Sequence, residues 1–134
     1  MDLAGEYRLS DAMIKALQSL GVRDNYIFVT TRVADLELFP GCQSQHSDEE
    51  IQAAFDIARH THALDLIRID RNKILDKTDY LMQPDYPQDS NEIRQAWLNY
   101  RQELRDLPAN SPDVSIDLET GELTGVVWPT EPTN

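Results

Sequence analysis

The chain has 134 residues, enough for one domain or for one small domain with an appended arm. Its formal net charge of −12 argues against non-specific nucleic-acid binding, because phosphates would be repelled, but permits a basic protein partner or mimicry of nucleic acid. The single cysteine, Cys42, excludes an intrachain disulfide and a cysteine-based zinc site within one chain.

The first part of the chain predicts a helix followed by a strand. Residues 10–21 place apolar side chains at helical spacing between Ser10, which can cap the start, and Gly21, which can close the end. Residues 26–33 are rich in β-branched and aromatic side chains, which favours a strand, and a Pro-Gly loop follows. We therefore expect residues 1–45 to form an N-terminal helix–strand segment, a candidate attachment region.

The clearest helix start is the stretch SDEE, from Ser47 to Glu50. In this capping-box pattern the Ser47 hydroxyl and the Glu50 carboxylate can each accept the other residue's main-chain N–H. One apolar face then continues to about Lys77, which is long for a small globular domain. A kink or break near Ile69 is the alternative. The face consists of Ile51, Ala54, Phe55, Ala58, His62, Leu66 and Ile69.

A second helix is expected after a proline-rich turn. It starts near Asp89 or Ser90, with Glu92 placed to complete a capping box with Asp89, and Pro108 stops it. Its two aromatic residues should pack against the first long helix near that helix's end, so that residues 46–108 form a helical hairpin. The apolar stripe consists of Ile93, Ala96, Trp97, Tyr100, Leu104 and Leu107.

After Pro108 the sequence changes to a β pattern. Residues 114–118 alternate in polarity, a turn through ETGE places Gly121 at an expected positive φ, and the pattern resumes at Leu123. Such a hairpin is marginal alone and needs a partner surface. Residues 109–134, with five acidic side chains and no basic one, are expected to form an acidic β-hairpin and a proline-rich extended tail. The predicted fold class is therefore α+β: a helical hairpin with an N-terminal helix–strand segment and a C-terminal β-hairpin.

No arrangement of side chains indicates catalysis, a metal or a cofactor. His60 and His62 point in nearly opposite directions on a helix, so they cannot easily share one ion. The acidic residues after Pro108 lack the spacing of a calcium loop, the glycines form no phosphate loop, and no serine or cysteine lies in a nucleophile motif. No apolar run approaches the ~18 residues of a membrane span and no leader is recognisable, so we expect cytosolic synthesis and no membrane partner.

The second half of the chain contains three stretches in this order: RNKILDKTDYLMQPD, YRQELRDLP and WPTEP, with Trp97 between the first two. The set and its order resemble the sequence pattern of the phage tail-assembly-chaperone-like family, found in small tail-fibre assembly proteins and at the ends of some tail proteins. The resemblance covers roughly residues 64–134. Tyr80 stands where the family usually has Trp, Ile74 replaces the first Leu of a pair, and a longer hairpin-like insertion precedes WPTEP. The matching residues are Arg71, Leu75, Thr78, Asp79, Pro84, Asp85, Trp97, Tyr100, Arg101, Gln102, Leu104, Arg105, Asp106, Leu107, Pro108, Trp128, Pro129 and Pro132.

The resemblance implies a protein, made in the host cytoplasm, that assists in building the phage tail or its fibres, or has a place within the virion tail, without catalysis. Its implied partners are other tail or tail-fibre proteins in an oligomeric assembly, and not nucleic acid. Its motif residues imply fold determinants: Arg105 and Asp106 can tie helix ends to the turn, and Trp128 can cover the helix pair. These determinants are Arg71, Asp79, Tyr80, Trp97, Tyr100, Arg101, Arg105, Asp106 and Pro108.

A docking surface, if the chain has one, is expected at the aromatic–proline edge of the last residues, which can accept a partner strand or groove. This edge comprises Leu123, Val127, Trp128 and Pro129. The alternative function is an acidic host-directed inhibitor or nucleic-acid mimic, which would array its acids on one face. An enzyme would instead need a pocket with convergent polar groups. Acids alternate with bases through the predicted helices and cluster only after Pro108, which favours the tail protein.

Overall fold

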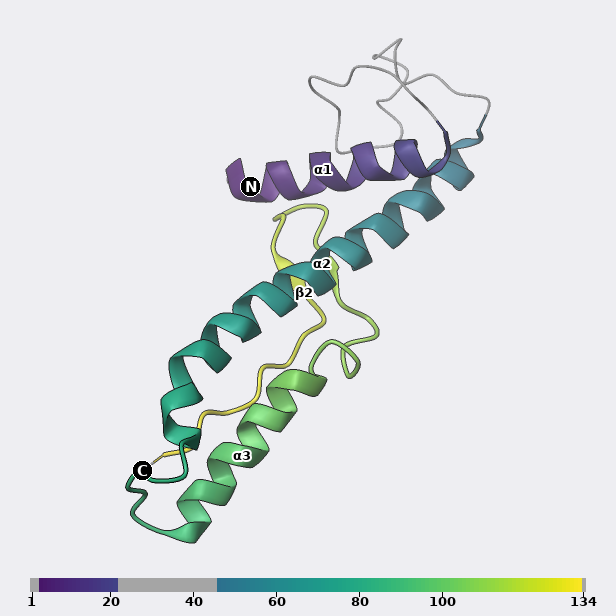
Figure 1. The fold of residues 1–134 in the computed structure, drawn as a ribbon. Coiled ribbons are helices and arrows are strands. Elements are labelled where there is room, and N and C mark those ends of the chain that lie inside the picture. The colour runs from purple at the N-terminus through teal and green to yellow at the C-terminus, as the bar shows by residue number, and fades with distance from the viewer. Residues whose placement is uncertain (1–2, 22–45, 134) are drawn as a thin grey trace. The chain divides into compact units, whose positions relative to one another are not determined.

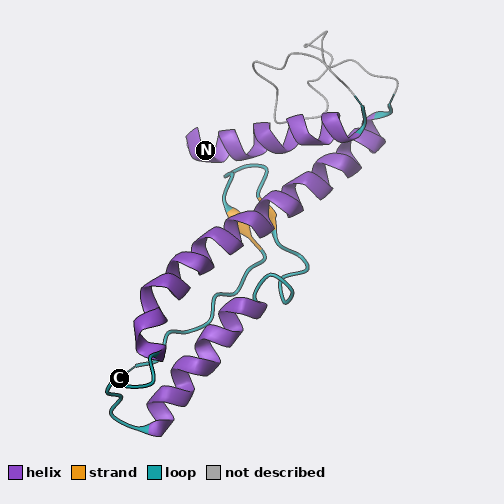
Figure 2. Ribbon diagram, in the orientation of Figure 1, coloured by secondary structure: helices purple, strands orange, loops and turns teal. Residues whose placement is uncertain are grey.

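The structure, a computed structural model, describes residues 3–21 and 46–133. Within these ranges the chain forms α-helices followed by a small antiparallel sheet (Figures 1 and 2), which confirms the α+β class with a C-terminal hairpin. The expected strand at residues 26–33 and Cys42 lie outside the described residues. The elements are α1 (Leu3–Ser19), α2 (Asp48–Thr78), the 3₁₀ helix η3 (Asp79–Met82), α3 (Asn91–Asp106), β1 (Ser115–Ile116) and β2 (Leu123–Thr124).

The contacts divide the chain into two compact units. Unit 1 comprises the described residues within Met1–Ala63 together with Val114–Thr124, and therefore holds α1, the first part of α2 and the β-hairpin. Unit 2 comprises Leu64–Asp113 and Gly125–Asn134, and holds the second part of α2, η3, α3 and the C-terminal segment.

In unit 1, helix α1 begins at Leu3 and not at the expected Ser10, which lies inside the helix. Packing explains the difference, because the buried stripe of α1 starts before Ser10 and needs the additional turns to continue. The end is as expected: Gly21 has a φ of +81° and its N–H donates to the Gln18 carbonyl over 3.0 Å. The buried stripe consists of Gly5, Leu9, Ala12, Met13, Ala16 and Leu17.

The expected capping box at the start of α2 is confirmed. The Glu50 N–H donates to Ser47 Oγ over 3.2 Å, and the Ser47 N–H donates to a Glu50 carboxylate oxygen over 3.5 Å. The helix continues without interruption to Thr78, so the alternative of a break near Ile69 is wrong. Ile69 itself was expected on the apolar face but is 53% exposed, because it lies nearly opposite the fully buried Ile67 on the helix.

The β-hairpin of unit 1 has the expected turn. Ile116 pairs with Leu123, and the intervening turn is closed by Asp117, whose carboxylate accepts the main-chain N–H groups of Thr120 and Glu119 at 2.8 Å each. These two hydrogen bonds lower the pKa of Asp117 below its ordinary range. Gly121 has the expected positive φ, +70°.

The rest of unit 1 supplies the surface that a two-stranded hairpin needs. A guanidinium N–H of Arg8 donates to the Gly121 carbonyl over 3.0 Å, and one of Arg59 donates to the Ile116 carbonyl over 2.7 Å. α1 also approaches the turn closely, since a Cβ placed on Gly121 would lie 2.3 Å from the Cα of Gly5. The hairpin is thus fastened at its tip by α1 and at its strand by α2.

Candidate functional site

In unit 2, helix α3 starts at a serine cap. The Ser90 hydroxyl accepts the N–H of Ile93 over 3.2 Å, so Ser90 is the cap and α3 begins at Asn91. The expected capping box of Asp89 with Glu92 is wrong, because counting from Ser90 puts Ile93 at the position that would close the box. The helix ends at Asp106, just before Pro108, as expected.

The aromatic residues of α3 form the core of unit 2. Trp97 and Tyr100 are buried and meet edge to face, with ring centroids 5.8 Å apart. The predicted packing against the end of α2 is confirmed, since Ile74 and Leu75 pack against this cluster. We call the buried cluster the seat; it consists of Leu81, Trp97, Tyr100 and Leu104. Partly buried side chains of Ile74, Leu75, Met82, Tyr86, Ile93 and Trp128 pack against it.

Two motif arginines hold the ends of the helix pair through main-chain carbonyls. Arg101 is 6% exposed; its guanidinium donates to the Leu75 carbonyl over 2.8 Å and also binds the Thr78 hydroxyl and the Asp79 carboxylate. Arg101 therefore satisfies groups in the last turn of α2 that a helix leaves unpaired. Arg71 donates to the carbonyl of Arg105 over 2.7 Å and ties α2 to the end of α3.

The side chains of Arg105 and Asp106 do not make the tie that the sequence suggested. Both are exposed, and each is hydrogen-bonded to Gln102 on its own helix. Their carbonyls contribute instead: that of Arg105 accepts from Arg71, and that of Asp106 accepts the Asn110 N–H over 3.0 Å. Arg101 was among the matching motif residues, but its hydrogen bonds to the last turn of α2 were not predicted. Its position one residue after Tyr100, at the border of the apolar stripe, is the feature of the sequence that points to these bonds.

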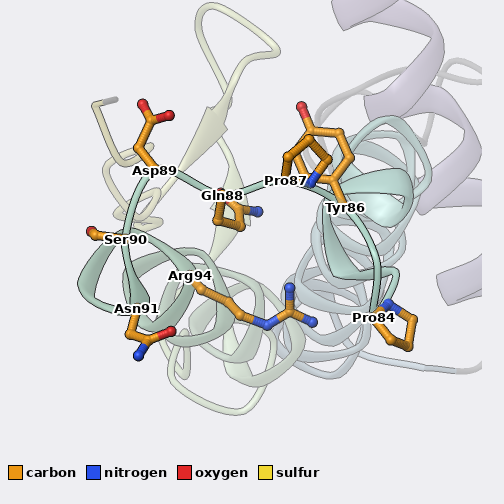
Figure 3. Close-up of a pocket in the computed structure, with 8 residues that line it drawn as sticks. All are labelled: Pro84, Tyr86, Pro87, Gln88, Asp89, Ser90, Asn91 and Arg94. Carbon is orange, nitrogen blue, oxygen red and sulfur yellow. The ribbon is translucent and has the colours of Figure 1, made fainter.

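The turn between η3 and α3 carries an open hollow with a cavity volume of about 750 Å³ (Figure 3). Its two longest polar side chains are engaged with the main chain of η3: Gln88 donates to the Leu81 carbonyl over 3.1 Å, and Arg94 donates to that of Met82 over 3.4 Å. Beside it, Tyr80 is 54% exposed and lies edge-on against Tyr86. The hollow is lined by Pro84, Tyr86, Pro87, Gln88, Asp89, Ser90, Asn91 and Arg94.

The last described residues of unit 2, 125–133, form a segment without regular secondary structure, which we call the strap. Figure 1 shows it in yellow. Of the expected docking residues, Val127 is 86% exposed, whereas Trp128 is partly buried against the seat and Pro129 is also partly buried. Leu123 belongs to β2 in unit 1 and is partly buried there. Burial raises the pKa of Tyr100, and the nearby negative charge of Glu131 raises it further.

The histidines that drew attention in the sequence have structural contacts in unit 1. His60 Nδ1 lies 2.7 Å from the Val114 carbonyl, and His62 Nδ1 lies 3.5 Å from a carboxylate oxygen of Asp11. In residues 3–21 and 46–133, no group of three histidine, cysteine, aspartate or glutamate side chains could hold a metal ion.

Comparisons with known proteins agree with the resemblance read from the sequence. In the described part of the chain, no helix is long and apolar enough to cross a membrane. No curated protein and no solved structure matches the chain significantly. The family model described as phage tail assembly chaperone protein matches residues 64–133, which is more than half of the 134 residues. The chain therefore belongs to the phage tail assembly chaperone family and has a role in phage tail assembly.

Proposed function

We propose that the chain is a non-enzymatic assembly factor that binds another protein of the phage tail or of its fibres, and that the outer face of the strap makes this contact. One observation carries the proposal. Val127 has the highest exposure, 86%, among the exposed large hydrophobic side chains of the described residues, and the neighbouring Trp128 is fixed against the seat. The strap thus exposes the apolar side chain of Val127 to solvent while Trp128 packs against the seat.

The main chain of the strap supports a strand-like contact. Among the described residues, no hydrogen bond or ion pair involves residues 125–133. Unpaired N–H and C=O groups beside an exposed β-branched side chain are the features to which an extended partner segment can add. Pro129 limits such pairing to the residues before it, because proline has no N–H. Of the four residues predicted at the docking edge, Leu123, Val127, Trp128 and Pro129, we propose Val127 as the one that touches the partner, because Leu123 lies in unit 1 and Trp128 and Pro129 are partly buried.

The test uses the phage that encodes this chain, with a tag on the chain. Mass spectrometry of assembly intermediates and of mature particles should find the chain in tail or fibre intermediates of the wild type. Val127→Asp should reduce this association by about ten-fold, because a carboxylate would lose its water in the contact. Ile69→Asp is the matched control, since Ile69, like Val127, is an exposed β-branched side chain of unit 2, and it should leave the association unchanged.

The same experiment separates a lasting component of the tail from a factor that leaves. Presence in mature particles at a copy number set by tail symmetry means a structural component, and presence in intermediates alone means a departing chaperone. Equal association of both variants would overturn the strap as the contact. Absence from every tail intermediate, with capture of a basic host protein, would support the alternative of an acidic inhibitor or nucleic-acid mimic. That alternative rests on the net charge of −12 and on the five acidic residues after Pro108.

A further inference from the structure

The strap is held in unit 2 by side-chain packing. Trp128 packs against the seat. Val126, Pro129 and Pro132 are also partly buried, whereas Glu131 is exposed. Trp128 is therefore the largest of the side chains that hold the strap in place.

The strap differs in this respect from the hairpin that precedes it. The hairpin is closed by paired main-chain groups, including the Asp117 N–H that donates to the Glu122 carbonyl over 2.9 Å. In the described part of the chain, residues 125–133 make no hydrogen bond. A segment with few buried contacts and no main-chain hydrogen bonds opens at a lower free energy than the elements around it. Lifting the strap from the seat requires the release of Trp128 and of the partly buried Val126, Pro129 and Pro132.

The strap also begins at a residue suited to a hinge. Gly125 follows β2 directly and has a φ of +79°, a conformation that glycine adopts without strain. The strap can therefore change direction at Gly125 without disturbing the pairing of β1 with β2. When extended, its nine residues span up to about 30 Å, enough to reach a neighbouring molecule.

We propose that the seat is a binding site for a Trp–Pro segment supplied by another molecule, and that its occupant is the strap of a second copy of this chain. Exchange of straps between two copies replaces each contact by the same contact, so no packing is lost. The strap of the same chain has an effective concentration of the order of millimolar, so isolated copies keep their own straps at lower concentrations. Exchange becomes populated where copies are concentrated, as in a growing assembly. The inference does not depend on the tail partner proposed above, because the seat contacts the inner side of the strap.

The first test measures binding of a fluorescein-labelled peptide with the sequence of residues 125–134 by fluorescence anisotropy. Trp128→Ala in the full chain should free the seat, so this variant should bind the peptide about ten-fold more tightly than the wild type, whose seat is mostly occupied. Ile69→Ala is the matched control, because Ile69 is an exposed side chain of unit 2 outside both the strap and the seat, and it should bind as weakly as the wild type. A peptide that itself carries Trp128→Ala should bind neither protein. Equal binding to wild type and Trp128→Ala, or no binding to a cooperatively folded Trp128→Ala, overturns the proposal.

A second measurement uses the unaltered chain and remains informative if Trp128→Ala does not fold. The chain has two tryptophans, so labelling with 5-fluorotryptophan gives one ¹⁹F signal for Trp97 and one for Trp128. Excess unlabelled peptide should move the Trp128 signal to the position of a solvent-exposed tryptophan, while the Trp97 side chain stays covered. A Trp128 signal that does not respond at saturating peptide means that the strap is not displaced and contradicts the proposal.

Sedimentation velocity tests the second copy as the occupant. The wild type and Ile69→Ala should form a dimer as the concentration rises toward about 1 mM, whereas Trp128→Ala should remain monomeric. Dimerisation of Trp128→Ala to the same extent as the wild type would place the self-contact elsewhere. A wild type that stays monomeric at that concentration would reject a second copy as the source of the segment.

Discussion

The contacts that stabilise unit 1 internally differ in kind from those within unit 2. In unit 1, side chains fasten the hairpin through its main chain: Arg8 reaches Gly121, 113 positions later in the sequence, and Arg59 reaches Ile116. In unit 2, an aromatic seat carries the packing, and Arg101 closes the end of α2 from the inside. The boundaries of the family match also differ from those of the compact units. The match covers unit 2 together with the hairpin, but the hairpin packs on α1, which lies outside the matched residues.

The strongest way to break this comparison is to remove one large core side chain from each unit. Phe55 in unit 1 is 1% exposed and Leu104 in unit 2 is 0% exposed. Phe55→Ala and Leu104→Ala should each lower the free energy of unfolding by about 3–4 kcal/mol, through lost burial and the cavity left behind. Hydrogen exchange followed by mass spectrometry should locate the loss of protection. Phe55→Ala should expose α1 and the hairpin before α3, and Leu104→Ala should do the reverse. Simultaneous loss in both units from either variant would mean that they unfold as one.

The close approach of α1 to the hairpin gives a sharper test of unit 1. Gly121→Ala should destabilise the protein by about 3 kcal/mol, because the new methyl group would meet the main chain of Gly5 and the left-handed conformation disfavours alanine. Gly21→Ala is the matched control: Gly21 has a φ of +81° and no atom of the described residues lies within 4 Å of an added Cβ, so it should cost only about 1 kcal/mol. Urea denaturation measures both. Equal effects would show that the conformation of the glycine, and not its contact with Gly5, decides the stability.

In unit 2, the two arginines of α3 that the motif contains should differ in importance. Arg101→Met should cost about 2 kcal/mol, because the Leu75 carbonyl and the Thr78 hydroxyl would lose a charged donor. Arg105→Met should change stability by no more than about 0.5 kcal/mol, since the Arg105 side chain is exposed and bonded only to Gln102 among the described residues. Thermal unfolding of the two variants makes the comparison. A larger loss for Arg105→Met would mean that the roles read from the contacts are reversed.

The smallest expected effect is a pH dependence at the junction of α1 and α2. The hydrogen bond to the Glu50 carboxylate, followed by that to the Leu20 carbonyl, raises the pKa of His46 above its ordinary value of 6.5. The pKa of Glu50 is lowered below 4.5, first by the bond with His46. The stabilisation from His46 is complete below 6.5 and is lost as the pH rises through its higher folded-state pKa, while that from Glu50 is lost as the pH falls below 4.5.

Melting temperatures measured between about pH 5 and pH 9 should therefore separate the wild type from His46→Gln. The wild type should exceed the variant near the acidic end of this range, and the difference should shrink toward the alkaline end. Because His60 and His62 remain in both proteins, the difference isolates His46. A difference that stays constant across the range would show that folding does not shift the pKa of His46.

Local signals in the sequence predicted several elements well. Ser47 and Glu50 start α2 because their capping box needs only residues three apart, and Gly121 marks the turn because its positive φ favours glycine. The spacing of Trp97 and Tyr100 likewise predicted the face of α3 that packs on α2. In each case the determining contact lies within the element, or the apolar period alone specifies the buried side.

The predictions that were wrong or incomplete depend on contacts that the sequence does not display. The start of α1 at Leu3 reflects burial of the residues before Ser10, which local capping rules do not include. Arg101 was placed in the motif without its bonds to Leu75 and Thr78, because these partners come from another helix. Trp128 was expected both to cover the helix pair and to belong to a docking edge; its packing against the seat, formed by η3 and α3, agrees with the first expectation, and the docking edge stays a prediction.

The position of the hairpin within the chain has a consequence for synthesis on the ribosome. Residues 114–124 belong to unit 1 but are translated after most of unit 2. Almost the whole chain must therefore be synthesised before the hairpin turn at Gly121 can pack against α1. The helix pair of unit 2 has a shorter delay, because α2, η3 and α3 follow one another directly, although the strap that packs on it is made last. The nascent chain should thus acquire its C-terminal helix pair before its N-terminal helix is fully covered, which reverses the usual order of vectorial folding.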